Sequence, residues 1–205
     1  MSIREEAWPF AAPPLVLAAV LTVTAHYWLM LPFWAVGLFV LAFFRDPHRT
    51  PPGDETLIVS AADGRVCQIA DLDGKKRVSV FMSVFNVHVN RSPVEGKIVG
   101  MEYNPGRFMN AAKEKASLDN EQLRYTLETM RGPVTVVQIA GLVARRIVPF
   151  VVQGAVMERG QRLGLIRFGS RVDFYWPPSR AEVLVSVGDR VKAGETPLAR
   201  WKESP

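Results

Sequence analysis

The hydrophobic pattern of this chain changes character near residue 45. Residues 11–44 contain no Asp, Glu, Lys or Arg, and an uncharged apolar run of this length is typical of a membrane segment. Pro32 is expected to divide it into Leu15–Leu31, which is near the minimum length for a span, and Phe33–Phe44, which is too short. The pattern predicts either two tilted helices or a helical hairpin that dips into one leaflet. A hairpin buried against a protein surface is the alternative.

Beyond this run, short apolar or alternating stretches separated by turn residues predict a β-rich domain. We expect a hydrophobic membrane-anchoring region at residues 1–44, a linker rich in proline and arginine at 45–56, and a β-rich domain at 57–205. The pattern predicts strands at 57–60, 78–89, 97–103, 134–140 and 171–175. It also predicts a loop at 107–120, a helix or a strand at 121–130, and a short helix at 141–148.

The tail at residues 181–195 has a pattern of its own. A strand, a Gly-Asp turn, a short strand and an Ala-Gly-Glu turn resemble half of a biotinyl- or lipoyl-type β-sandwich. The lysine hairpin of a swinging-arm carrier is missing, so we do not expect that role. The predicted fold class is mainly β (α+β), a β-sandwich or barrel with biotinyl/lipoyl-like character, preceded by a membrane-associated helical hairpin.

Composition narrows the classes of function. The single cysteine, Cys67, excludes an internal disulfide and is expected to be buried. The three histidines have no metal-ligand spacing, so we expect no metal site. The chain carries a net charge of +5 and residues 45–205 carry +6, because Arg4, Glu5 and Glu6 are the only charged side chains before them. With the apolar N-terminus, this charge favours an anionic membrane surface as partner. Basic and aromatic residues do not interleave, so we expect no nucleic-acid partner.

One dipeptide, Gly169-Ser170, has two interpretations. It lies between two strand-like runs, where a Gly-Ser pair usually forms a bulge or tight turn. Alternatively, the serine hydroxyl attacks the preceding carbonyl and breaks the chain, given a base that takes its proton. Two other polar residues, Asp63 and His88, are open to the same choice between structure and chemistry. The first would be a turn aspartate and the second a hydrogen-bonded core histidine.

Separated blocks of the sequence, in a fixed order, carry a family resemblance. These blocks are FFRDP at 43–47, ADGRV at 62–66, FMSVFNVHVNRSP at 81–93, QIAGLVARRI at 138–147 and GLIRFGSR at 164–171. Together with the tail they cover nearly all of the chain after the apolar run. They closely resemble the short bacterial phosphatidylserine decarboxylases, which are pyruvoyl-dependent enzymes made as proenzymes.

The resemblance implies self-cleavage between Gly169 and Ser170. It would give a β chain, 1–169, and an α chain, 170–205, that stay together. The family's processing triad maps onto Asp63, His88 and Ser170. Ser170 would become a covalent pyruvoyl group that forms a Schiff base with phosphatidylserine, releasing CO₂ and phosphatidylethanolamine without metal or pyridoxal phosphate. Longer members have a threonine where this chain has Arg171, and two histidines in the block that holds His88. The proton donor during turnover therefore stays open.

The implied location is the cell membrane, as a peripheral or monotopic protein with the catalytic domain facing the cytoplasm. The implied partners are an anionic lipid and the membrane surface; a homo-oligomer is compatible with the sequence. Two alternatives remain at this point. One is a decarboxylase of another serine-headgroup lipid, such as archaetidylserine. The other is a membrane-anchored lipoyl-like β-domain that acts as an adaptor and carries out no chemistry.

Overall fold

The computed structural model describes residues 1–106, 120–141, 146–167 and 169–202. The chain forms two compact units, Met1–His48 and Arg49–Pro205. Most of the loop predicted at 107–120 lies outside the described residues, as do residues 142–145 of the helix predicted at 141–148.

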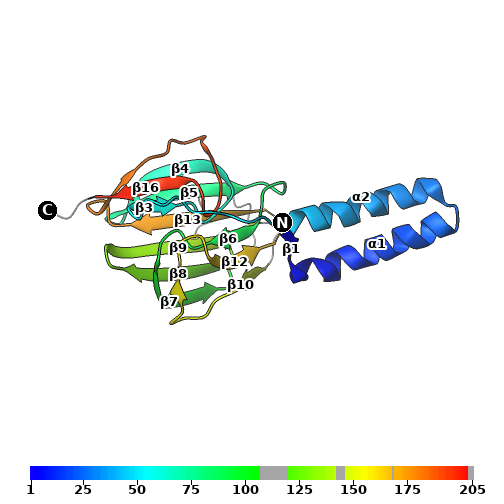
Figure 1. The fold of residues 1–205 in the computed structure, drawn as a ribbon, viewed down its shortest axis with the longest axis horizontal. Helices are drawn as coiled ribbons and strands as arrows, with labels where there is room; N and C mark the ends of the chain where they lie inside the picture. Colours follow the sequence, from blue (N-terminus) through cyan, green and yellow to red (C-terminus); the bar gives the residue numbers. More distant parts are fainter. Residues whose placement is uncertain (107–119, 142–145, 168, 203–205) are drawn as a thin grey trace. The chain divides into compact units, whose positions relative to one another are not determined.

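The first unit is a pair of apolar helices. A 3₁₀ turn, Glu5–Ala7, leads into α1, Trp8–Val23, and α2 spans Tyr27–Phe43 (Figure 1). Two-residue strands pair antiparallel at the base of the hairpin, β1 at Ser2–Ile3 and β2 at Arg45–Asp46.

The predicted division of the apolar run at Pro32 is wrong. Pro32 lies inside α2, and the chain turns at Thr24–His26, where Ala25 has a φ of 60°. The polar side chains explain this position: Thr24 Oγ1 donates to the Val20 carbonyl at 3.0 Å, and His26 Nδ1 lies 3.0 Å from Thr24 Oγ1. Proline inside a helix removes one backbone hydrogen bond, and α2 continues through Pro32 despite this loss.

The two helices pack closely and are apolar on their outer faces. A Cβ at Gly37 would clash with the Leu15 side chain, so a larger residue there would require Leu15 to move. Large side chains such as Val20, Leu31 and Leu38 are more than half exposed. In the described part of the chain, Glu5–Val23 is the one helix long and apolar enough to cross a membrane, and Tyr27–Phe43 is a shorter apolar helix.

The second unit is mainly β, which confirms the predicted fold class. Its strands are β3 (Leu57–Val59), β4 (Gly64–Leu72), β5 (Lys75–Met82), β6 (Val89–Arg91), β7 (Gly96–Asn104), β8 (Gln122–Thr129), β9 (Gly132–Ala140), β10 (Ile147–Pro149), β11 (Val156–Met157), β12 (Arg162–Ile166), β13 (Ser170–Trp176), β14 (Ala181–Val183), β15 (Arg190–Val191) and β16 (Pro197–Trp201).

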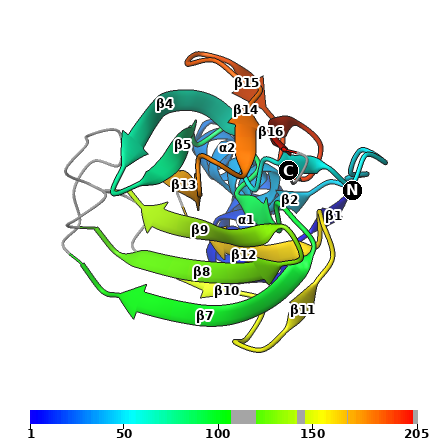
Figure 2. The same cartoon turned by 90° about the vertical axis from the view of Figure 1, so that its left-hand side faces the viewer.

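Eight of these strands form one antiparallel sheet in the order β11-β7-β8-β9-β13-β5-β4-β15. The sheet curls into a half-barrel from β7 round to β4 (Figure 2). Two three-stranded sheets, β10-β12-β6 and β14-β16-β3, complete the unit. Alternate residues of β13, Val172, Phe174 and Trp176, lie in the hydrophobic core. The central position of β13 places Ser170 opposite Met82 of β5 and Ala140 of β9.

Several predicted elements differ from the structure. The strand predicted at 78–89 ends at Met82, and a turn separates it from β6. The ambiguous segment 121–130 is strand β8, and Ile147–Pro149 is strand β10 rather than helix. The prediction that Cys67 is buried is wrong. It is exposed at the register shift of β4, where its Sγ–H donates to the Ser79 carbonyl at 3.4 Å.

Candidate active site

The turn between β5 and β6 presents His88 to the start of β13. Asn86 Oδ1 accepts from both the backbone N–H and the Oγ of Ser83, each at 2.8 Å, and the Asn86 N–H donates to the Ser83 carbonyl at 2.9 Å. Such side-chain-to-backbone bonds offer the chain an alternative to the strand ladder. They explain why the apolar run breaks here. Val84 and Phe85, at the tip of this turn, are 37% and 75% exposed.

His88 is fully buried, and its partners indicate its tautomer. Nδ1 lies 3.0 Å from the Asn86 carbonyl oxygen, which can only accept, so Nδ1 carries the proton in neutral imidazole. Nε2 then carries the lone pair, and it accepts the Gly169 N–H at 3.3 Å. The basic nitrogen of His88 therefore lies at the Gly169-Ser170 dipeptide.

Gly169 has the geometry that a reactive carbonyl would need. Its φ of 80° lies in the left-handed region that favours glycine, and open space surrounds its Cα, so backbone conformation selects glycine here. Its carbonyl oxygen accepts the N–H of Gly141, which follows β9, at 3.0 Å. A backbone N–H aimed at a carbonyl oxygen can stabilise the negative charge that develops on nucleophilic attack.

Ser170 begins β13 and is fully buried. Its hydroxyl donates to Met82 Sδ at 3.2 Å, and a thioether is a weak acceptor. A hydroxyl with a weak partner gives up little when it turns to a better base. The structure thus brings together a serine, the carbonyl before it, a backbone donor on that carbonyl and the lone pair of His88.

Asp63 lies in a different set of contacts. Its Oδ2 accepts from Arg49 Nη2 at 2.8 Å and its Oδ1 accepts from the Ala193 N–H at 2.8 Å; the carboxylate is mostly buried. Arg49 also donates to Glu195 at 3.1 Å. The segment of Asp63 reaches that of His88 through the backbone, because the Arg91 N–H donates to the Ala61 carbonyl at 2.9 Å. Asp63 therefore links Arg49 of the linker to Ala193 of the C-terminal tail.

Arg171, the residue after Ser170, forms a buried ion pair. Arg171 pairs with Asp173 through two hydrogen bonds, Nε to Oδ1 at 2.8 Å and Nη2 to Oδ2 at 3.0 Å. Their side chains are 2% and 0% exposed. Charge-assisted bonds in this paired geometry are among the strongest that side chains make.

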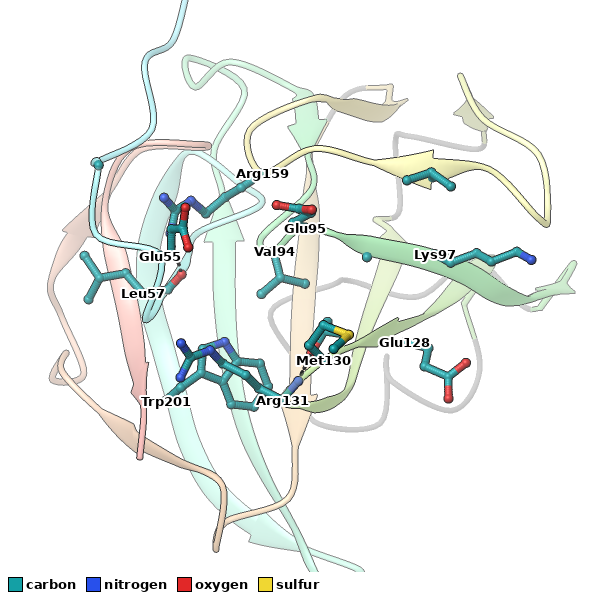
Figure 3. A pocket seen from close by; sticks show the side chains of 14 residues that line it. Glu55, Leu57, Val94, Glu95, Lys97, Glu128, Met130, Arg131, Arg159 and Trp201 are labelled. Carbon is teal, nitrogen blue, oxygen red and sulfur yellow. Dashed lines mark hydrogen bonds between the residues drawn. The ribbon is translucent and has the colours of Figure 1, made fainter. Parts of the chain in front are cut away.

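A further cavity among the described residues lies elsewhere. It has a volume of about 890 Å³, and Figure 3 shows its charged and apolar lining side chains, among them Lys97, Glu128, Arg159 and Trp201. It sits at the β8–β9 turn, whereas Ser170 pairs with the opposite end of β9. Eight residues of strand separate the two, about 25 Å. This cavity is not part of the candidate site.

Sequence reasoning found Ser170, Gly169, His88 and Asp63 but missed their partners. The missed residues are Arg49, Met82, Asn86, Gly141 and Asp173. Only the Arg-x-Asp spacing of 171 and 173 carried a local signal, because residues two apart share a strand face. The others meet the site through strand pairing or turns that a single sequence does not reveal.

Comparisons with known proteins match this chain to proteins that all carry the same name. A family model described as phosphatidylserine decarboxylase matches residues 36–199. A phosphatidylserine decarboxylase proenzyme of Aromatoleum aromaticum is 50% identical over 206 residues, covering 96% of this chain and 94% of its own. Proteins of the same name from Burkholderia mallei and Nitrosomonas eutropha are each 47% identical. They cover 99% and 98% of this chain and 97% and 95% of their own.

Proposed function

The chain belongs to the phosphatidylserine decarboxylase family, and on this premise we propose that it converts phosphatidylserine to phosphatidylethanolamine and CO₂. The proposed electrophile is a covalent pyruvoyl group, which the chain makes from Ser170 by cutting itself between Gly169 and Ser170. The observation that carries this proposal is the contact of His88 Nε2 with the Gly169 N–H, beside the Gly169 carbonyl and Ser170.

We propose that cleavage follows from this geometry. His88 Nε2 takes the proton of Ser170 Oγ, and the oxygen attacks the Gly169 carbonyl carbon, whose developing charge Gly141 N–H stabilises. The C–N bond breaks and an ester joins Gly169 to Oγ. Loss of the Ser170 α-proton expels the Gly169 carboxylate and leaves dehydroalanine. Water then hydrolyses this group to pyruvoyl and ammonia.

We assign Asp63 to the same step as a supporting acid. Its carboxylate is mostly buried and fixed by Arg49 and the Ala193 N–H, and it lies two residues after Ala61, whose carbonyl accepts the Arg91 N–H of β6. A negative charge in this place favours the imidazolium that forms when His88 takes a proton. The Asn86 carbonyl, at Nδ1, holds the tautomer.

The surroundings of Ser170 fit a pyruvoyl group. The side chain is fully excluded from water and lies between Met82 and Ala140. A pyruvoyl group supplies an electron sink for the decarboxylation of a bound amino acid. An apolar setting favours the loss of charge when a carboxylate leaves as CO₂. His88 stands beside it to hold or deliver a proton.

The cut chain would remain one molecule. β13 is hydrogen-bonded to β9 and β5 along its length, and Ala193 and Glu195 of the α chain contact Asp63 and Arg49 of the β chain. The resulting α and β chains therefore stay packed without a covalent link.

The helical hairpin would attach the protein to the cell membrane as a peripheral or monotopic protein whose catalytic unit faces the cytoplasm. The apolar surfaces of α1 and α2 and the arginines that follow α2 support this arrangement. A V20D/L38D variant should bind anionic vesicles at least tenfold more weakly in a sedimentation assay, since a charge costs about 3 kcal/mol in the bilayer core. Val187→Asp, at an exposed position of the other unit, should bind like the wild type; equal binding by all three proteins would remove the anchor.

Intact-mass measurement of the purified protein tests the central step. We expect two fragments, 1–169 and 170–205, whose summed mass equals the precursor plus one water minus one ammonia. The smaller fragment should resist Edman degradation because it lacks an amino terminus, and Ser170→Ala should remain one chain. A wild-type protein found as a single uncut chain would contradict the proposal and favour the adaptor.

A further inference from the structure

A second cavity, on the β8 side of the candidate site, holds an unsatisfied carboxylate oxygen. It has a volume of about 620 Å³, and its lining includes Tyr103, Glu121, Arg146 and Ile147. Glu121 is 3% exposed. Its Oε1 accepts from the Tyr103 hydroxyl at 3.0 Å and from the Ile147 N–H at 3.3 Å, but Oε2 has no hydrogen-bond partner among the described residues.

A buried carboxylate oxygen without a partner is costly and indicates a missing donor. The opposite charge lies in the same cavity, because Arg146 is exposed and lines it. Burial first, and then the hydrogen bond to Glu121, raise the pKa of Tyr103, while the charge of Arg146 acts in the opposite direction. Tyr103 and Arg146 both line this cavity.

The cavity adjoins the reacting segment. The Ala140 N–H donates to the Glu121 carbonyl at 3.0 Å, and Ala140 lies opposite Ser170. The Arg167 N–H donates to the Arg146 carbonyl at 3.1 Å. Two strand spacings separate Glu121 from Ser170, about 10 Å. A group bound at Glu121 is near the site but does not occupy it.

We propose that this cavity is a subsite for a phosphoethanolamine headgroup, with its ammonium on Glu121 Oε2 and its phosphate on Arg146. A carboxylate accepts from an ammonium and a guanidinium binds a phosphate, so the two charges match a zwitterion. A phosphoserine headgroup fits poorly, because its own carboxylate, one carbon from the ammonium, would approach Glu121. The subsite therefore prefers the product over the substrate. The assignment to a product rests on the proposed function.

Calorimetric binding to the Ser170→Ala protein in detergent micelles tests this inference. The probes are soluble glycerophosphoethanolamine and glycerophosphoserine, and without a pyruvoyl group neither can react. We expect the ethanolamine compound to bind about tenfold more tightly, as a nearby like charge weakens binding by about 1 kcal/mol or more. Adding phosphatidylethanolamine to the micelles should weaken its apparent binding if the lipid headgroup uses the same cavity. If the lipid does not compete, the site takes only soluble phosphoethanolamines and its role as a product subsite is refuted.

Two variants locate the preference. Adding Glu121→Gln should bring the ratio of the two affinities to about one, since it removes the charge and keeps the size. Adding Arg146→Gln should weaken both probes by a similar factor and keep the ratio. Glu182→Gln, on an exposed position of β14, is the matched control and should change neither. If the Glu121 variant does not fold, two other results test the inference. They are the ratio of the two affinities in the Ser170→Ala protein and the change of that ratio on adding Arg146→Gln.

Equal binding of the two probes, no binding of the ethanolamine compound, or a preference that survives Glu121→Gln would overturn the inference. Each outcome leaves the decarboxylase proposal untouched, because the test protein is uncut. Conversely, a wild-type chain that never cuts itself would remove the decarboxylase proposal and leave the binding result standing.

Discussion

The two sequence neighbours of Ser170 differ in backbone conformation and in strand pairing. Gly169 is half-buried, has a left-handed φ and lies outside the strand ladder, with its carbonyl on the Gly141 N–H. Arg171 is buried inside β13, bonded to strands on both sides and paired with Asp173. We call Gly169, which lies outside the strand ladder, the weak side of Ser170. Arg171, which lies within the ladder, is the rigid side. The comparison teaches that the bond proposed to be cut and the strand that stays intact are separated by one residue.

The largest expected effect comes from removing the base on the weak side. Replacing His88 by glutamine leaves a polar side chain but no group that takes a proton near neutral pH. We expect self-cleavage to slow by about 10²–10⁴-fold, the usual contribution of a general base. A time course on denaturing gels measures it. His48→Gln, at an exposed position, is the control; cleavage at the wild-type rate in His88→Gln would remove the base from the weak side.

A smaller effect tests the rigid side. Asp173→Ala leaves the Arg171 guanidinium buried without its carboxylate, and breaking such a pair costs about 3–5 kcal/mol of unfolding free energy. Urea unfolding of the uncut Ser170→Ala background measures it. Replacing both partners together, as R171L/D173L, should cost much less because no charge is left buried. A double variant as unstable as the single one would show that the pair is not what holds β13.

The smallest effect concerns the conformation of Gly169. Alanine in the left-handed region costs about 1–2 kcal/mol, and open space around Cα means that no clash adds to it. Gly169→Ala in the Ser170→Ala background should lower the unfolding free energy by this amount in the same assay. Gly53→Ala, which also meets nothing within 4 Å but whose φ is not positive, should be near neutral. Equal effects at the two positions would mean that φ is unimportant.

Much of the β unit could be predicted from the sequence. The strand-like run at 134–140 and the alternating run at 171–175 predicted strands β9 and β13, which are almost entirely buried on both faces. The turn at Ser83–His88 was missed because two polar residues in an apolar run were outweighed by their neighbours. In the hairpin, Pro32 was given more weight than the polar Thr24 and His26, which mark the actual turn.

The candidate site was predictable only where its residues form local motifs. Ser170 and His88 stand in recognisable blocks of sequence, so the resemblance identified them. Gly141 contributes a backbone N–H, which any residue except proline supplies, so its sequence carries no signal of this role. Arg49 and Glu121 obtain their partners through contacts 14 and 18 positions away or more. Such contacts depend on sheet register, which the pattern of one chain does not determine.

The double pairing of β13 has a consequence for the order of events in the cell. Serine, histidine and the Gly141 amide come from three distant segments, and they meet only after β13 has inserted between β5 and β9. Under the proposed self-cleavage, a nascent or misassembled copy therefore keeps an inert hydroxyl and never exposes a reactive ketone to cellular amines. The proposed maturation would therefore also check folding, because only a chain with β13 in place between β5 and β9 could form the electrophile.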